Sequence, residues 1–295
     1  MKIHKMIRSY ISYVIVVLFS IIFNIIPRAL SLLLGKFLGL VIYHIFPIRK
    51  KVAIKNIKDN FSNLDSTKHN NLLKNTYVHF GMVLSDFMRQ NFLNRQKIND
   101  LVNINAKTLE ILNQNKGSII MTGHIGNWEC FLPILGLNHI KFAVVTQKIK
   151  NSYLNKFFTS LRSFQNVKII PRHDGKEKMF DAMNQNYHLG LASDQNAGSK
   201  GTMVPFLNTK ISIPKGAAIF HIKTKKPILV GFCTMNKDYK YDFNIQELKF
   251  NHKIKSRSEL INDINSQFTS ILGELIRKYP DQYFWFHKMK DKSEY

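Results

Sequence analysis

Residues 121–129 read Met-Thr-Gly-His-Ile-Gly-Asn-Trp-Glu and place His124 five positions before Glu129. A histidine can take the proton of an attacking hydroxyl, and a carboxylate behind it can fix the imidazole tautomer and stabilise the imidazolium. This bare spacing is expected roughly 0.7 times by chance in a chain of this composition. The whole string is more specific, since Gly123 and Gly126 flank the histidine and allow close approach of backbone or substrate. We therefore interpret His124 as a general base that Glu129 supports.

The chain around this string alternates short apolar runs with helical patterns, which predicts an α/β domain with a largely parallel sheet. A strand over 118–122 leads into His124, and Asp194 follows the apolar run 189–193 in the same way. Sites in such sheets form where strands end, so these polar residues could converge there. Further strands are expected over 142–146, 167–170, 227–234 and near 243–250, and helices over 65–90, 107–114, 127–137, 151–164, 175–187, 214–224 and 257–279.

The first 58 residues carry ten Lys or Arg and no acidic residue. The uncharged stretch 9–27 would form a helix of about 28 Å, close to the ~30 Å hydrocarbon core of a bilayer. A second apolar run, 29–46, follows it, whereas a signal peptide would end at a small-residue cleavage site. We therefore expect 1–58 to be a retained membrane anchor with a basic collar over 49–58 that suits lipid phosphates.

No linker, repeat or low-complexity block divides the remaining residues, so 59–295 is expected to form one domain. Cys130 and Cys233 lie far apart without a Cys-x-x-Cys motif, which favours reduced, buried thiols and a cytoplasmic face. No spacing of His and Cys indicates a metal site, and we expect neither a metal nor another cofactor.

The net charge of +24, from 43 basic and 19 acidic residues, indicates an anionic partner. Nucleic acid, an anionic bilayer and an acidic protein all meet that description. The sequence shows no signature of a nucleic-acid-binding fold and its N-terminus is hydrophobic, so we do not expect nucleic acid as the partner.

The segment from Thr122 to Glu129 resembles that of the lipid A late acyltransferases, the lauroyl and myristoyl transferases of lipopolysaccharide biosynthesis. The resemblance covers most of the chain, and this segment is its most diagnostic block. It implies the glycerolipid-acyltransferase type of twisted mixed sheet flanked by helices. The other matching blocks are Arg49-Lys50-Lys51 with Asn56–Phe61, Leu161-Arg162-Ser163, Ser193-Asp194-Gln195, Val204-Pro205-Phe206 and the closing segment Tyr279–Lys288.

The resemblance also implies the activity: an O-acyltransferase that moves a fatty acyl group from acyl carrier protein to a hydroxyl of an acyl chain on the phosphorylated lipid A precursor. It carries over Arg162 as a functional arginine that stabilises an oxyanion or grips a phosphate, with Arg172 as a rival. Asp194 matches the family's second acidic position, which supports the site or binds the polar head of the acceptor. Trp128 and His287 are interpreted as packing residues.

A covalent acyl-enzyme is not expected, because no Gly-x-Ser-x-Gly elbow occurs and Cys130 has no activating neighbour. Two alternatives remain open. One is acylation of another membrane glycolipid or a lysophospholipid, from acyl carrier protein or acyl-CoA. The other is a catalytically inactive lipid-binding protein in the membrane.

The expected location is the inner membrane, with the catalytic domain on its cytoplasmic face. Basic residues before the first apolar run and after the second both favour the cytoplasm. A hairpin or a shallow anchor in the cytoplasmic leaflet satisfies both signals. Lys36 and His44, eight residues apart near one helical face, favour one deep helix followed by an interfacial one.

Overall fold

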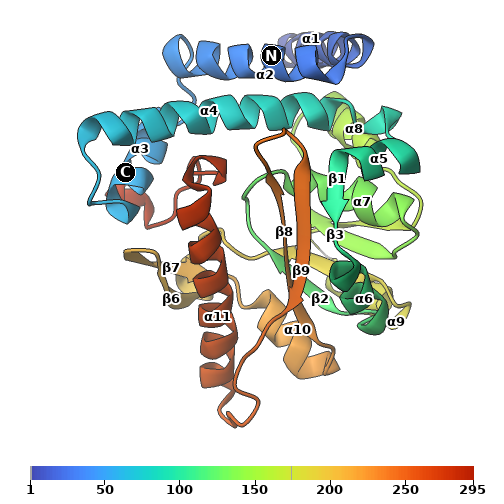
Figure 1. The fold of residues 1–295 in the computed structure, drawn as a ribbon, viewed down its shortest axis with the longest axis vertical. Coiled ribbons are helices and arrows are strands. Elements are labelled where there is room, and N and C mark those ends of the chain that lie inside the picture. The colour runs from blue at the N-terminus through green and yellow to red at the C-terminus, as the bar shows by residue number, and fades with distance from the viewer. Residues whose placement is uncertain (1, 174) are drawn as a thin grey trace.

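Residues 2–173 and 175–295, which this computed structural model describes, form a seven-stranded sheet with helices on both faces and a helical layer across one end (Figure 1). The strands of the sheet are β1 (Val102–Ile104), β2 (Ile119–Thr122), β3 (Phe142–Thr146), β4 (Val167–Pro171), β5 (His188–Ala192), β8 (Ile228–Met235) and β9 (Tyr241–Glu247). The α-helices are α1 (Lys2–Ile25), α2 (Arg28–His44), α3 (Lys50–Asn60), α4 (Ser66–Met88), α5 (Arg95–Leu101), α6 (Ala106–Gln114), α7 (Phe131–Leu137), α8 (Ser152–Leu161), α9 (Lys176–Asn184), α10 (Gly216–Thr224) and α11 (Arg257–Lys278).

The sheet has the strand order β1-β9-β8-β2-β5-β3-β4. Every neighbouring pair is parallel except β8 and β9, which are antiparallel. The predicted fold class, an α/β domain with a largely parallel mixed sheet flanked by helices, is therefore confirmed. Strand β2 lies between β8 and β5, and Thr122 at its end pairs with Ala192 at the end of β5.

Alternate side chains of β2 point into two separate cores. Ile119 and Met121 are fully buried in a core shared with α9, α10 and α11. Ile120 is fully buried in a second core shared with α5 and α7. Because burying one such side chain contributes about 1.5–3 kcal/mol, both faces of the central strand stabilise its position and the place where it ends.

Helices α1 and α2 form a layer over α4, whose opposite side faces the sheet (Figure 1). Helix α2 lies so close to α4 that their backbones touch. A Cβ on Gly35 would lie 2.6 Å from the carbonyl oxygen of Gly81, and a Cβ on Gly81 would overlap the carbonyl of Gly35. Gly39 meets the Tyr77 carbonyl in the same way. Three glycines therefore set the spacing between α2 and the body of the protein.

Helix α1 is the one helix among the described residues that is long and apolar enough to cross a membrane, over Met6–Ile25. Only 11% of its most apolar window is buried. Its ends are nevertheless attached to the body, since Asn151 donates to the Ser9 carbonyl and both Ser20 and Asn24 donate to the Met88 carbonyl. An exposed apolar helix at this place is weak support for the expected anchor.

Two α-helices and three strands were not expected from the sequence: α3, α5, β1, and the strands β6 (Thr202–Phe206) and β7 (Thr209–Ile213) of a two-stranded hairpin. Helix α3 begins in the predicted basic collar, ends two residues beyond it, and buries Ala53, Asn56, Ile57 and Asn60. Two of these four buried residues are asparagines, so the sequence of α3 lacks the regular spacing of apolar residues that would predict a helix. Strand β6 is not predicted because it contains Pro205, and proline is unfavourable inside strands.

The contact between α2 and α4 predicts a specific glycine requirement. Gly81→Ala should lower the free energy of unfolding by about 1–3 kcal/mol, because the added methyl overlaps backbone that cannot move aside. Gly273→Ala in α11 is the matched control, since its Cβ would lie 3.6 Å from the nearest atom, an ordinary contact. Thermal unfolding in detergent should show a destabilised Gly81 variant and an unimpaired Gly273 variant. Equal stability of the two would contradict the close packing.

Candidate active site

The ends of β2 and β5 bring His124 and Asp194 together. The Ser193 amide donates to the Thr122 carbonyl at 2.8 Å, which continues the parallel pairing past the end of both strands. The Asp194 carboxylate then receives two hydrogen bonds from His124, Oδ1 from the ring Nδ1 and Oδ2 from the backbone amide, each 2.7 Å long. The Asp194 side chain is 1% exposed and that of His124 is 15% exposed, so the carboxylate is sealed while the imidazole keeps an open edge.

Glu129 has a different partner. It lies in the short 3-10 turn Trp128–Cys130 and binds Arg162, the residue after α8, through Nε to Oε2 at 2.8 Å and Nη2 to Oε1. This geometry corrects the expectation that Glu129 holds the imidazole tautomer, because Asp194 makes that hydrogen bond. Arg172, the rival arginine, is exposed beyond the edge strand β4. Of the two arginines, the structure joins Arg162 to the segment around His124, through Glu129.

The turn that carries His124 is fixed by backbone contacts on both sides. The His124 carbonyl accepts from the Phe284 amide at 2.8 Å, and the Gly126 amide donates to the Gln282 carbonyl at 2.9 Å. Gly126 has φ of +62°, and a Cβ there would overlap the Cys233 carbonyl. At Gly123 a Cβ would lie 3.2 Å from Asp194 Oδ2. The absence of a side chain at Gly126 therefore lets strand β8 approach closely, and its absence at Gly123 leaves room for the Asp194 carboxylate.

Asn127, expected to start a helix, instead connects the turn to the N-terminal layer. Its side-chain amide donates to the hydroxyl of buried Tyr241 at 3.1 Å, and that hydroxyl donates to Asp86 at 2.8 Å. Arg28 at the start of α2 binds the same Asp86 carboxylate with two hydrogen bonds of 2.9 and 2.7 Å. A buried polar chain thus runs from α2 through α4 and β9 to the His124 turn.

Two further residues contact His124 that the sequence did not assign to the site. Gln195 Nε2 lies 3.2 Å from His124 Nε2 and 2.8 Å from His287 Nε2. The His287 ring, interpreted from the sequence as packing, has its centre 5.1 Å from that of His124. Trp128 packs edge-on against His124 at 4.8 Å, and Phe284 packs against both Trp128 and His287. The signals for Gln195 in the sequence were its position directly after Asp194 and its place in the matching block 193–195.

The environment raises the pKa of His124 and lowers the pKa values of Asp194 and His287. Burial would lower the pKa of His124, but the charge and hydrogen bond of Asp194 outweigh it and raise that pKa above its usual 6.5. Burial would raise the pKa of Asp194, yet its interactions with His124 lower it, so the carboxylate is ionised. Burial, followed by the proximity of His124, lowers the pKa of His287 to about 4. At neutral pH the site therefore holds one carboxylate and one neutral histidine beside His124.

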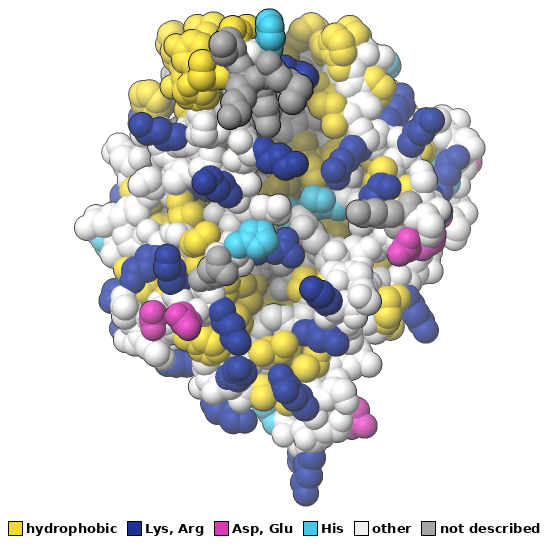
Figure 2. All heavy atoms as spheres, turned by 180° about the vertical axis from the view of Figure 1, so that it is seen from behind, with side chains coloured by type: hydrophobic (Ala, Val, Ile, Leu, Met, Phe, Trp, Pro, Cys, Tyr) yellow, Lys and Arg dark blue, Asp and Glu magenta, His cyan; other side chains and the backbone are white. Residues whose placement is uncertain are grey.

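The face of the molecule in Figure 2 is hollowed near its centre, where histidine side chains reach the surface. Lys and Arg side chains are spread around this hollow, and few acidic side chains accompany them. This distribution suits an anionic ligand that approaches from solvent or from a membrane surface.

An ionised carboxylate behind an imidazole, at the ends of parallel strands, is an arrangement by which enzymes take a proton from a hydroxyl. Residues 1–290 match the family of bacterial lipid A biosynthesis acyltransferases, and the chain belongs to this family. It is also similar to the phosphatidylinositol mannoside acyltransferase of Mycolicibacterium smegmatis, with 22% identity over 131 residues. The match covers 43% of each chain, less than half the length of that relative. The comparisons thus identify the chain as a member of a family of acyltransferases.

The contact between Asp194 and His124 predicts how the imidazole titrates. Asp194→Asn should lower the pKa of His124, because the charge that stabilises the imidazolium is removed while burial remains. Carbethoxylation of His124, followed against pH by peptide mass spectrometry, should then have its midpoint at lower pH. Glu129→Gln should move the midpoint less, since Glu129 is the smallest of the contributions to the raised pKa. A larger shift for Glu129→Gln would contradict the assignment of Asp194.

Proposed function

We propose that the protein transfers a fatty acyl group from acyl carrier protein to a hydroxyl of an acyl chain on the phosphorylated lipid A precursor, giving an acyloxyacyl product. The observation that carries this proposal is the His124–Asp194 pair at the strand ends, in which the carboxylate is sealed and the imidazole is partly exposed. Membership of the lipid A biosynthesis acyltransferase family supports the class of acceptor.

In the proposed mechanism His124 acts through Nε2, because Nδ1 donates to Asp194. Nε2 removes the proton of the acceptor hydroxyl as its oxygen attacks the thioester carbonyl. The tetrahedral intermediate then collapses, the carbon–sulfur bond breaks, and the imidazolium returns its proton to the thiolate. Asp194 stabilises the transient imidazolium, and no covalent acyl-enzyme forms.

We assign Arg162 to the oxyanion or to a phosphate of the acceptor, as its place in the family pattern suggests. Glu129 acts through it as a positioning residue: a two-point ion pair fixes both the place and the plane of the guanidinium. In this proposal Glu129 remains important for transfer although it does not hold the imidazole.

The proposal places the protein on the cytoplasmic face of the inner membrane, where an acidic carrier protein can reach it. The exposed apolar side chains of α1 and α2 continue into the loop after α2, where Ile45, Phe46 and Ile48 are exposed. Arg49 follows this loop directly and donates to the Phe286 carbonyl, next to His287. A bilayer in contact with this apolar layer would present its acceptor lipids near the site.

A second candidate acceptor is another membrane glycolipid. The observation that favours it is the relative from Mycolicibacterium smegmatis, whose name describes acylation of a phosphatidylinositol mannoside. An inactive lipid-binding protein is disfavoured, because such a protein would have no need for a sealed carboxylate hydrogen-bonded to an accessible imidazole.

The mechanism predicts a steep loss of activity on removal of the base. His124→Ala should reduce acyl transfer by the purified protein by roughly 10²–10⁴-fold, while the exposed His252→Ala serves as the control. Adding Asp194→Ala to His124→Ala should cost little more, since paired groups act as a unit. Activity of His124→Ala above about a tenth of the wild-type rate would exclude it as the general base.

The donor assignment predicts sensitivity to salt. Screening weakens the attraction between a basic protein and an acidic carrier, so the rate at low donor concentration should fall as salt rises. Acyl carrier protein should also be preferred over acyl-CoA with the same acyl chain. A preference for acyl-CoA in competition assays would favour the alternative lipid acyltransferases.

A further inference from the structure

The side chain of Gln195 bridges two imidazoles. Its amide nitrogen lies 2.8 Å from His287 Nε2 and 3.2 Å from His124 Nε2, the atom that the proposed mechanism uses as the base. An amide NH₂ carries two hydrogens, so one group can donate to both rings at the same time. Both ring nitrogens are then acceptors, with a lone pair and no hydrogen.

The contact on the other edge of His124 supports this placement of protons. If the amide oxygen faced a neutral His124, Nε2 would carry the hydrogen and Nδ1 would present a lone pair to Asp194 Oδ1 at 2.7 Å. Two acceptors at that distance repel each other. With the amide NH₂ facing the rings, Nδ1 donates to the carboxylate and Nε2 accepts from Gln195, so every contact has one donor and one acceptor.

We propose that Gln195, oriented by His287, holds His124 in the neutral Nδ1–H tautomer and so keeps the base ready for the acceptor hydroxyl. A hydrogen bond donated to the unprotonated Nε2 favours the neutral imidazole, which opposes the effect of Asp194. The two residues are positioning residues in this account, which rests on the proposed function of His124.

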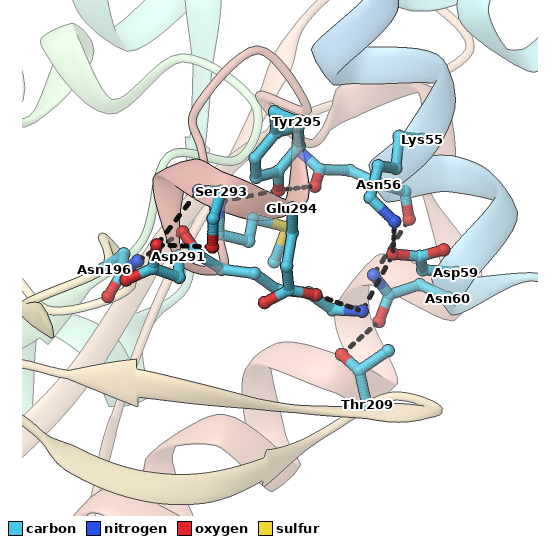
Figure 3. Close-up of polar contacts among 12 residues, drawn as sticks. Lys55, Asn56, Asp59, Asn60, Asn196, Thr209, Asp291, Ser293, Glu294 and Tyr295 are labelled. Carbon is cyan, nitrogen blue, oxygen red and sulfur yellow. Dashed lines mark hydrogen bonds and ion pairs between the residues drawn. The ribbon is translucent and has the colours of Figure 1, made fainter.

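The C-terminal segment fixes His287 in place. Buried Asn56 on α3 donates from its side-chain amide to the carbonyls of both Trp285 and His287, each at 2.7 Å. Beyond His287, Lys290 binds Asp59 on the same helix at 2.9 Å, and its carbonyl accepts from Asn196 at 2.7 Å. Figure 3 shows the neighbouring contacts between α3 and the C-terminal segment, among them the hydrogen bond from Tyr295 to Asn56. The packing of α3 therefore determines where the His287 ring meets Gln195.

The surrounding charges keep His287 an acceptor. Burial lowers the pKa of His287 most, and the proximity of His124 and the guanidinium of Arg49 lower it further; the charge of Asp194 raises it, and the resulting pKa is about 4. The charged and titratable groups that face His124 itself are Asp194, His287 and, from the turn after it, Glu129, while the hydroxyl of Tyr283 is hydrogen-bonded to Asp194. Above pH 5, neutral His287 can accept from Gln195 throughout the working range of the base.

The two distances from the Gln195 amide nitrogen to the histidine rings are unequal, which suits displacement of the amide from His124 by the acceptor hydroxyl. The longer contact, at 3.2 Å, is the one that an acceptor hydroxyl must replace, whereas the shorter one to His287 retains the amide. Once His124 has taken the proton and the hydroxyl oxygen has moved to the acyl carbon, the amide retained by His287 again lies beside Nε2–H, and two donors oppose each other. This opposition favours return of the proton to the leaving thiolate and so completes the transfer.

The test is ¹⁵N NMR of the full-length protein in detergent, labelled at histidine, with signals assigned through His124→Ala. We expect His124 at neutral pH to carry its hydrogen on Nδ1 and a lone pair on Nε2. His287→Phe keeps a ring but removes the acceptor, and should raise the pKa of His124 by roughly 0.5–1 unit, the size of one lost hydrogen bond. Gln195→Glu, which has no N–H, should raise the pKa of His124 further. His287→Gln, whose amide oxygen can accept in place of the ring, should leave that pKa at its wild-type value.

The acid limb of the pH–rate profile should move upward with the same variants, so that activity at pH 6 falls more than activity at pH 8. A purely structural role would lower both alike. An Nε2–H tautomer in the wild type, or an unmoved pKa of His124 in His287→Phe, would overturn the inference. The NMR measurement needs no turnover, so a protein that transfers no acyl group but shows these shifts would refute the proposed function while confirming that Gln195 and His287 fix the tautomer of His124.

Discussion

Parallel strands β2 and β5 end level with each other, and this register places the backbone and ring of His124 against one carboxylate. Asp194 receives a hydrogen bond from each at 2.7 Å, so a shift of β5 by one residue would break both. The carboxylate is buried, and a buried charge is tolerated only when it is paired and hydrogen-bonded. The two cores on either side of β2 therefore stabilise the site as well as the sheet.

Both ends of the chain complete this arrangement. From the C-terminal side, Phe284 and Gln282 pair with the backbone of the His124 turn, and His287 reaches Gln195. From the N-terminal side, Arg28 and Asp86 extend a polar chain to Asn127 in the same turn. If the protein attaches to a membrane through the apolar surface of α1 and α2, the attached layer is thus connected by hydrogen bonds to the turn that positions His124.

The sequence predicts the sheet well, because its strands are short apolar runs bounded by turn residues and their ends locate His124 and Asp194. It does not predict which carboxylate meets the imidazole. Spacing along the chain gives no direction for the turn at Gly126, which carries Glu129 towards Arg162, while Asp194 arrives from a strand 70 residues later. Gln195 and His287 escape prediction for a related reason, since their contact depends on α3 and the C-terminal segment packing together.

The central claim is that His124, backed by Asp194, activates a hydroxyl of the lipid A precursor. Mass spectrometry of lipid A from cells that lack this protein tests it most directly. The account predicts that lipid A loses the mass of one fatty acyl group, that the wild-type gene restores it, and that neither His124→Ala nor Asp194→Ala does. Unchanged lipid A, or full restoration by the His124 variant, would contradict the account.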